Sequence, residues 1–267
     1  MIIFFLSFFL FGLVIGSFLN VVVARTHSLE TLLGRSYCRS CRAIIRWFDN
    51  IPLLSFLLLR GKCRRCRSAI SWRYPFVELS TGILFALVGW KFFDVSNTTS
   101  WVETILYLWV VCFALVIALY DARHYEIPMH LLWAMVVVVL GHIVVLDIIN
   151  FSASILWWDV LLYKHLISSA VAFGIFYLLS FASKERWMGY GDAYVVLAIG
   201  LSIGSGVFGA IMLGSIVGAL YGVGNIFLSR KTLASQIPFA PFLCIGMGIM
   251  LFLGDELARF APLVFWE

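Results

Sequence analysis

Apolar residues fill long stretches of this chain, and polar residues gather in the short segments between them. A membrane-spanning helix needs about 20 mostly apolar residues. Stretches close to this length predict spans at 2–24, 75–93, 102–120, 131–149, 161–182, 193–207, 208–228 and 237–254. The sixth and seventh meet in Ser202-Ile-Gly-Ser-Gly206, which we expect to be the turn between them. The pattern therefore predicts an all-α polytopic membrane protein with about eight transmembrane helices.

Composition supports this class of protein. The chain has 267 residues, of which 63% are hydrophobic and only 12% are charged. A soluble domain is closer to half apolar and a quarter charged, so lipid must cover part of this surface. Because apolar runs recur from residue 2 to residue 265, the pattern excludes a soluble domain with one anchor or one secretory signal.

The basic residues predict the orientation of the chain. With the N-terminus outside, the cytoplasmic loops are 25–74, 121–130, 183–192 and 229–236, and they hold 16 of the 19 Lys and Arg residues. This is the asymmetry expected of an inner-membrane protein. The net charge of +5 thus reflects topology, and we expect no nucleic-acid partner.

The 25–74 loop carries two C-x-x-C pairs, Cys38 with Cys41 and Cys63 with Cys66, separated by 21 residues. This spacing is typical of a structural zinc site, in which four thiolates surround the ion. A loop of this length is too small for an ordinary core, so a metal would organise it. Disulfides, a redox pair, another metal and unbound thiols are the alternatives. A reducing cytoplasm disfavours disulfides.

Two aspartates lie beside predicted spans on the same side of the membrane. Asp121 ends the third span, and Asp192 begins the sixth within Gly189-Tyr-Gly191-Asp192. Facing carboxylates that share one proton can perform aspartyl proteolysis: one activates water and the other protonates the developing oxyanion. The position of Asp192 at a helix N-terminus would favour its ionised form. Gly189 and Gly191 would let the backbone pass close to a substrate.

Simpler roles compete with this interpretation. Both aspartates could cap helices, and Glu78 and Glu126 could be structural or could line a polar pocket. We expect other side chains to be uninvolved: solvated acids at Glu30, Asp49 and Glu185, and small buried apolar residues at Cys112 and Cys244.

An ordered set of motifs resembles the bacterial type IV prepilin peptidases, also called prepilin leader peptidase/N-methyltransferases. The motifs run from Gly16-Ser-Phe-Leu-Asn-Val-Val22 through Asn50-Ile-Pro-Leu-Leu-Ser55, Leu59-Arg-Gly-Lys-Cys63 and Val77-Glu-Leu-Ser-Thr-Gly82 to Gln236-Ile-Pro-Phe-Ala-Pro-Phe242. The two cysteine pairs and the two aspartate motifs occur among them in the family's order. The resemblance covers nearly the whole chain.

The resemblance implies that Asp121 and Asp192 are a catalytic pair that removes the basic leader of prepilins or pseudopilins on the cytoplasmic side. It also implies N-methylation of the new N-terminus with S-adenosylmethionine, an activity associated with the four-cysteine loop. The implied domains are a first helix at 1–24, a cytoplasmic four-cysteine methyltransferase region at 25–74 and a seven-helix aspartyl protease core at 75–267. No glycine-rich fingerprint marks a cofactor pocket, so the cofactor-binding residues are not assigned.

Two positions depart from the family pattern. Tyr194 stands where the family commonly has Lys, and Arg25-Thr-His-Ser28 replaces the usual Arg-Leu-Pro. Three other functions remain open: a peptidase without methyltransferase activity, an ion-coupled transporter that uses the same aspartates, and a zinc-stabilised scaffold without enzymatic activity. Transporter sites usually lie at mid-membrane, whereas both aspartates are expected near one face.

Overall fold

The computed structural model describes residues 2–28, 30–32, 34–150, 161–228 and 236–260. The chain divides into two compact units, residues 1–112 and 113–267, and helix α4 crosses from one to the other. The described elements are, in chain order, α1 (Ile2–Ser28), η1 (Trp47–Asn50), α2 (Leu54–Leu58), α3 (Arg73–Phe92), α4 (Thr98–His124), α5 (Met129–Asn150), α6 (Leu161–Ser183), α7 (Tyr190–Ile203), α8 (Gly206–Phe227) and α9 (Ala240–Phe260).

Each of the eight predicted spans corresponds to one helix. Among the described residues, seven helices are long and apolar enough to cross a membrane, and α7 is apolar but has only 14 residues. At about 1.5 Å per residue, α7 is roughly 21 Å long, less than the roughly 30 Å of a bilayer's hydrocarbon core. The predicted multi-pass helical fold is confirmed, with one helix shorter than expected.

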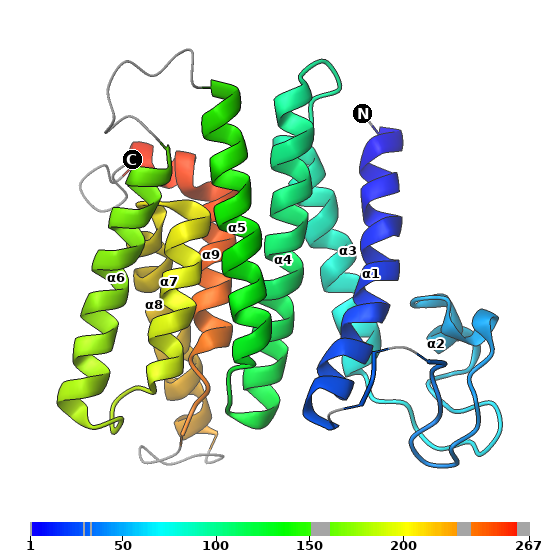
Figure 1. Cartoon of the computed structure of the whole chain (residues 1–267). Coiled ribbons are helices and arrows are strands. Elements are labelled where there is room, and N and C mark those ends of the chain that lie inside the picture. The colour runs from blue at the N-terminus through cyan, green and yellow to red at the C-terminus, as the bar shows by residue number, and fades with distance from the viewer. Residues whose placement is uncertain (1, 29, 33, 151–160, 229–235, 261–267) are drawn as a thin grey trace. The chain divides into compact units, whose positions relative to one another are not determined.

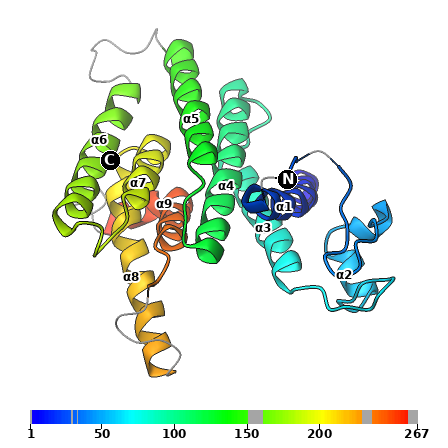
Figure 2. The same ribbon diagram turned by 60° about the horizontal axis from the view of Figure 1, so that its bottom comes forward.

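In the first unit, α1 and α3 run side by side (Figure 1, Figure 2). Gly12 and Gly16 of α1 form a G-x-x-x-G pair, the spacing that allows membrane helices to approach closely. A Cβ atom on Gly12 would lie 2.8 Å from the Cα of Gly82, and one on Gly16 would lie 2.8 Å from the Cα of Glu78. The pair therefore packs backbone against backbone.

The second unit uses small residues in the same way. A Cβ atom on Gly200 of α7 would lie 2.7 Å from the Cα of Ser169 in α6, and one on Gly214 of α8 would lie 2.7 Å from the carbonyl oxygen of Phe242 in α9. These contacts pack α6 against α7 and α8 against α9 (Figure 1). They hold together the helices around α7, which carries Asp192.

A short turn joins α7 to α8, as the sequence predicts. Gly204 has a φ angle of +57°, which a residue with a side chain rarely adopts. Its N–H donates to the carbonyl oxygen of Gly200, 2.8 Å away, and this bond ends α7. The next helix begins two residues later at Gly206.

Candidate active site and metal centre

Asp121 lies in the last turns of α4 and is almost completely buried, with 5% of its surface exposed. The backbone N–H of Ala240, the first residue of α9, donates to its Oδ2 at 3.2 Å. The N-terminus of a helix has unpaired N–H groups and a partial positive charge, and both stabilise a carboxylate. The expected capping role is therefore real for Asp121, and it fixes the position of the carboxylate.

Asp192 is the third residue of α7. This helix begins directly after Gly189, whose backbone is extended. Its backbone N–H donates to the carbonyl oxygen of Gly189 at 3.2 Å, and its side chain is half-buried. Helix α7 packs against both α5 and α9. The negative charge on Asp121 acts on the carboxyl group of Asp192. Two acids 71 positions apart in the sequence thus lie within range of each other's charge.

The two glycines beside Asp192 have different surroundings. A Cβ atom on Gly191 would lie 2.7 Å from the Cδ1 atom of Ile127, in the segment between α4 and α5. The nearest atom to a Cβ on Gly189 is 3.9 Å away. Gly191 therefore lets Ile127 pack directly against the start of α7, a contact that the sequence did not indicate. The role of both glycines in passing a substrate stays a prediction.

Tyr194, the residue that replaces the family's usual Lys, belongs to an aromatic cluster. Its ring centroid lies 5.4 Å from that of Phe173 in α6 and 5.9 Å from that of Trp133 in α5. Aromatic pairs at such distances stabilise packing by about 0.5–1.5 kcal/mol each beyond the area they bury. In this chain the position links three helices through apolar contacts instead of placing a cation near Asp192.

The two cysteine pairs form two copies of one turn. The N–H of Cys38 donates to the carbonyl oxygen of Ala43 at 2.9 Å, and the N–H of Cys63 donates to that of Ser68 at 2.9 Å. Arg42 and Arg67, which directly follow the second cysteine of each pair, have nearly equal φ angles of 58° and 59°. Each turn directs two sulfur atoms towards the other turn.

The four sulfur atoms lie within 4.8 Å of one another, and the Sγ atoms of Cys38 and Cys66 are 3.9 Å apart. In a tetrahedral site with Zn–S bonds of about 2.3 Å, sulfur atoms are about 3.8 Å apart. The donor set and spacing therefore fit a zinc ion with no open position. Cys112 and Cys244, each half-buried, lie in α4 and α9 outside this cluster.

Hydrogen bonds and lost solvation change the pKa of three of the four cluster thiols. The Ser68 hydroxyl, followed by the Ser68 backbone N–H, lowers the pKa of the Cys66 thiol to about 6. The backbone N–H of Cys41 lowers the pKa of the Cys38 thiol. For the Cys41 thiol, the N–H of Ala43 acts in the same direction, but lost solvation and the neighbouring thiols raise its pKa to about 11. The spacing of the cysteines does not indicate the role of Ser68.

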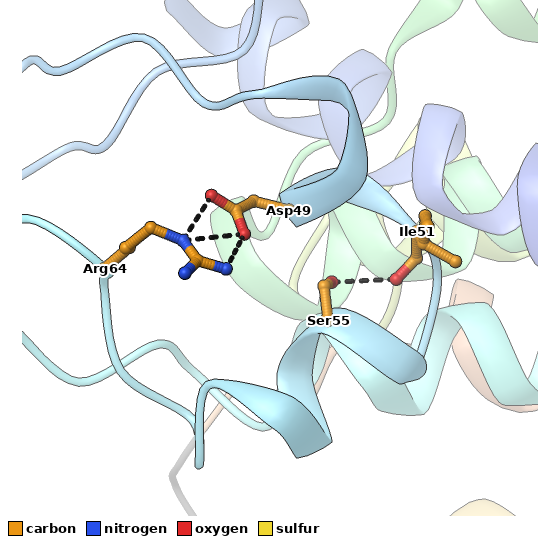
Figure 3. Close-up of polar contacts among 4 residues, drawn as sticks. All are labelled: Asp49, Ile51, Ser55 and Arg64. Carbon is orange, nitrogen blue, oxygen red and sulfur yellow. Dashed lines mark hydrogen bonds and ion pairs between the residues drawn. The ribbon is translucent and has the colours of Figure 1, made fainter.

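An arginine of the second cysteine turn pairs with an acid. The Arg64 guanidinium donates to both oxygens of Asp49, with Nη2 2.6 Å from Oδ1 and Nε 2.9 Å from Oδ2 (Figure 3). The Asp49 side chain is 9% exposed, so the expectation that it is solvated is wrong. The pair joins η1 to the second cysteine turn. Nearby, the Ser55 hydroxyl donates to the Ile51 carbonyl oxygen at 2.7 Å (Figure 3).

Glu78 and Glu126, which the sequence left open, differ in their surroundings. Glu126 is exposed. Glu78 is buried in α3, and its Oε2 accepts a hydrogen bond of 2.9 Å from the backbone N–H of Leu53. The Cα atom of Glu78 also lies against Gly16 of α1. Glu78 therefore connects the four-cysteine loop to both helices of the α1 and α3 pair.

The fold and these sites define a class: a multi-pass helical membrane protein with a four-cysteine domain and two interacting buried or half-buried acids. A model of the Bacterial Peptidase A24 N-terminal domain matches residues 10–92, and a model of the Type IV leader peptidase family matches residues 108–223. The chain belongs to the Type IV leader peptidase family.

Several curated relatives are similar over nearly their whole length. The prepilin leader peptidase/N-methyltransferase of Pseudomonas aeruginosa is 33% identical, and the match covers 94% of this chain and 90% of the relative. The proteins of the same name from Aeromonas salmonicida and Legionella pneumophila are 31% and 30% identical, over 94% and 93% of this chain and 91% of each relative. No solved structure matches the chain significantly.

Proposed function

We propose that the chain is an aspartyl endopeptidase that removes the leader of prepilins or pseudopilins, with Asp121 and Asp192 as the catalytic pair. The observation that carries the proposal is that α9, whose first N–H binds Asp121, packs against α7, which carries Asp192. In addition, Gly191 beside Asp192 packs against Ile127, six residues after Asp121. Membership of a peptidase family and the names of the relatives supply the substrate class.

The chemistry follows from the surroundings of the two acids. Neighbouring carboxylates do not readily carry two negative charges, so the pair holds one proton between them. The ionised member takes a proton from water, and the resulting nucleophile attacks the scissile carbonyl carbon. The protonated member gives its proton to the oxyanion, which forms a gem-diol. The first acid then passes the proton that it took from water to the amide nitrogen, and the second acid takes a proton back from the gem-diol as the C–N bond breaks and the new amino terminus leaves. The N–H of Ala240 holds Asp121 in place for this step.

The side of the membrane is part of the proposal. Asp121 ends α4 and Asp192 begins α7, and the basic-residue count assigns these ends to the cytoplasm. The expected cytoplasmic segment 229–236 lies almost entirely outside the described residues. A substrate with a basic leader followed by one apolar helix would present its junction at this level.

Zinc is proposed as a structural ion held by Cys38, Cys41, Cys63 and Cys66. Four cysteine ligands leave no position for water, so the ion would organise the loop and take no part in hydrolysis. The second proposed activity is N-methylation of the newly formed amino terminus, for which the relatives' names are the support. S-adenosylmethionine would supply the methyl group, and no residue of this chain is assigned to it.

The test compares cleavage of a leader-bearing precursor by wild type, Asp121→Asn and Asp192→Asn in lipid nanodiscs, with a labelled methyl donor present. Glu126→Gln is the matched control, because it removes an exposed carboxylate five residues from Asp121. We expect both Asn variants to be folded and unable to cut, and the control to cut like wild type. Undiminished cleavage by either Asn variant would reject the pair, and a folded wild type that never cuts would favour a transporter or scaffold.

A further inference from the structure

Helix α2 in the four-cysteine loop exposes an apolar face. Leu54, Leu57 and Leu58 are 49%, 68% and 73% exposed. Their spacing of three and four residues places them on one side of the helix. Phe56 points the other way, is buried, and contacts the ring of Trp72 with centroids 4.8 Å apart. A helix that leaves three leucines uncovered needs an apolar surrounding on that side.

The depth of α2 relative to α3 indicates that lipid provides the apolar surrounding of these leucines. The N–H of Leu53, the residue before α2, donates to Glu78, and Glu78 lies five residues inside α3, which begins at Arg73. Five residues of helix correspond to about 7.5 Å, and helix side chains lean towards the N-terminus of the helix, so α2 starts inside the end of the span by up to about that distance. In Figure 1, α2 lies beside the lower half of α1 and α3 and not below their ends. Interfacial helices bury their apolar face to roughly this depth, about 5–10 Å.

Aromatic and basic residues of the same loop fit the border of a membrane. Trp72 directly precedes the first residue of α3 and is 75% exposed, and Trp47 is 80% exposed. Tryptophan side chains favour the level of the lipid headgroups. The 25–74 loop carries 11 basic residues against two acidic ones, Glu30 and Asp49, and Asp49 is paired with Arg64. This excess of positive charge complements anionic lipid headgroups.

We propose that α2 is an interfacial membrane anchor: Leu54, Leu57 and Leu58 enter the leaflet beside α1 and α3, and the basic residues of the loop bind anionic headgroups. The four-cysteine domain is then held flat on the bilayer by lipid as well as by its chain connections. The depth of Leu53 favours lipid over a protein partner as the occupant of this face. The inference is independent of the proposed catalytic activity.

The test uses the full-length chain in nanodiscs of phosphatidylcholine and phosphatidylglycerol, with a fluorescent amino acid incorporated at position 57 or, in a second variant, at position 58. A probe at the exposed Ser40 is the matched control, because it lies in the same loop next to Cys41 and is not one of the basic residues proposed to bind headgroups. Emission is measured with lipids brominated on the acyl chain and with a water-soluble quencher. The rate at which a protease digests the 25–74 loop is compared between each probe variant and the wild type, to verify that the loop is folded.

We expect brominated lipid to quench the probes at 57 and 58 and not the probe at 40. The water-soluble quencher should quench the probe at 40 and not those at 57 and 58. Replacing phosphatidylglycerol by phosphatidylcholine, or adding salt, should weaken the quenching by brominated lipid, because screening weakens headgroup binding. Probes at 57 and 58 that respond only to the water-soluble quencher would overturn the proposal. Probes shielded from both quenchers would overturn it as well, because protein would then cover the face.

Discussion

Removing the Glu78 side chain tests the connection between the four-cysteine loop and the membrane helices. In Glu78→Ala, the N–H of Leu53 loses the acceptor that lies 2.9 Å away in the wild type. A buried donor left without a partner costs about 1–3 kcal/mol. We expect this loss to lower the free energy of local opening at α2 by the same amount. Because each 1.4 kcal/mol changes an equilibrium constant about tenfold, exchange of the Leu53 amide with solvent should become roughly 5- to 150-fold faster.

Hydrogen exchange in nanodiscs, followed by mass spectrometry of peptides that contain residues 50–58, measures this effect. Glu78→Gln keeps an oxygen acceptor, so its acceleration should be smaller than that of Glu78→Ala. Glu103→Ala is the matched control, since Glu103 is a half-buried acid of α4 in the same unit. Equal exchange of these peptides in Glu78→Ala and wild type would refute the proposed connection.

Three further predictions concern packing and the metal. Gly16→Leu should lower the free energy of unfolding by about 1–3 kcal/mol, because the new Cβ atom would meet the backbone of α3. Gly141→Leu should not lower it, because no atom lies within 4 Å of a Cβ at that position. Equal losses in thermal unfolding experiments would contradict the close contact between α1 and α3. Gly191→Val should lower the unfolding temperature more than Gly189→Val, because only Gly191 is packed against another side chain, and the reverse order would count against that contact. Zinc release to a coloured chelator should rise as pH falls, because each cysteine binds the ion as a thiolate and protons compete with the ion for it. Hydrogen bonds from Ser68 lower the pKa of the Cys66 thiol to about 6 without metal, so this ligand is mostly a thiolate above that pH and release should be slight there. Release that does not change with pH would contradict a thiolate site.

Features that depend on local sequence could be predicted well. Every expected span became a helix whose ends lie within a few residues of the expected ones, because a run of apolar residues is itself the reason the segment enters lipid. The spacing of the cysteines likewise predicted their cluster, because each C-x-x-C turn brings two sulfurs together whatever surrounds it.

Features that depend on contacts between distant residues were missed. Asp49 was expected in water and is paired with Arg64, and the Ala240 N–H that holds Asp121 comes from a residue 119 positions away. Nor did the sequence show that Gly191 accommodates Ile127 or that α2 forms. Such features arise only when the chain has folded, and no periodicity along the sequence encodes them.

The mutual dependence of Asp121 and Asp192 is the central claim, and one set of cleavage rates tests it most directly. Precursor cleavage is measured for Asp121→Asn, Asp192→Asn and the double variant in the same nanodiscs. Groups that act as a unit show non-additive effects, so all three variants should fall to one common background rate. A single variant that retains substantial cleavage, or a double variant far slower than either single one, would contradict a shared catalytic proton.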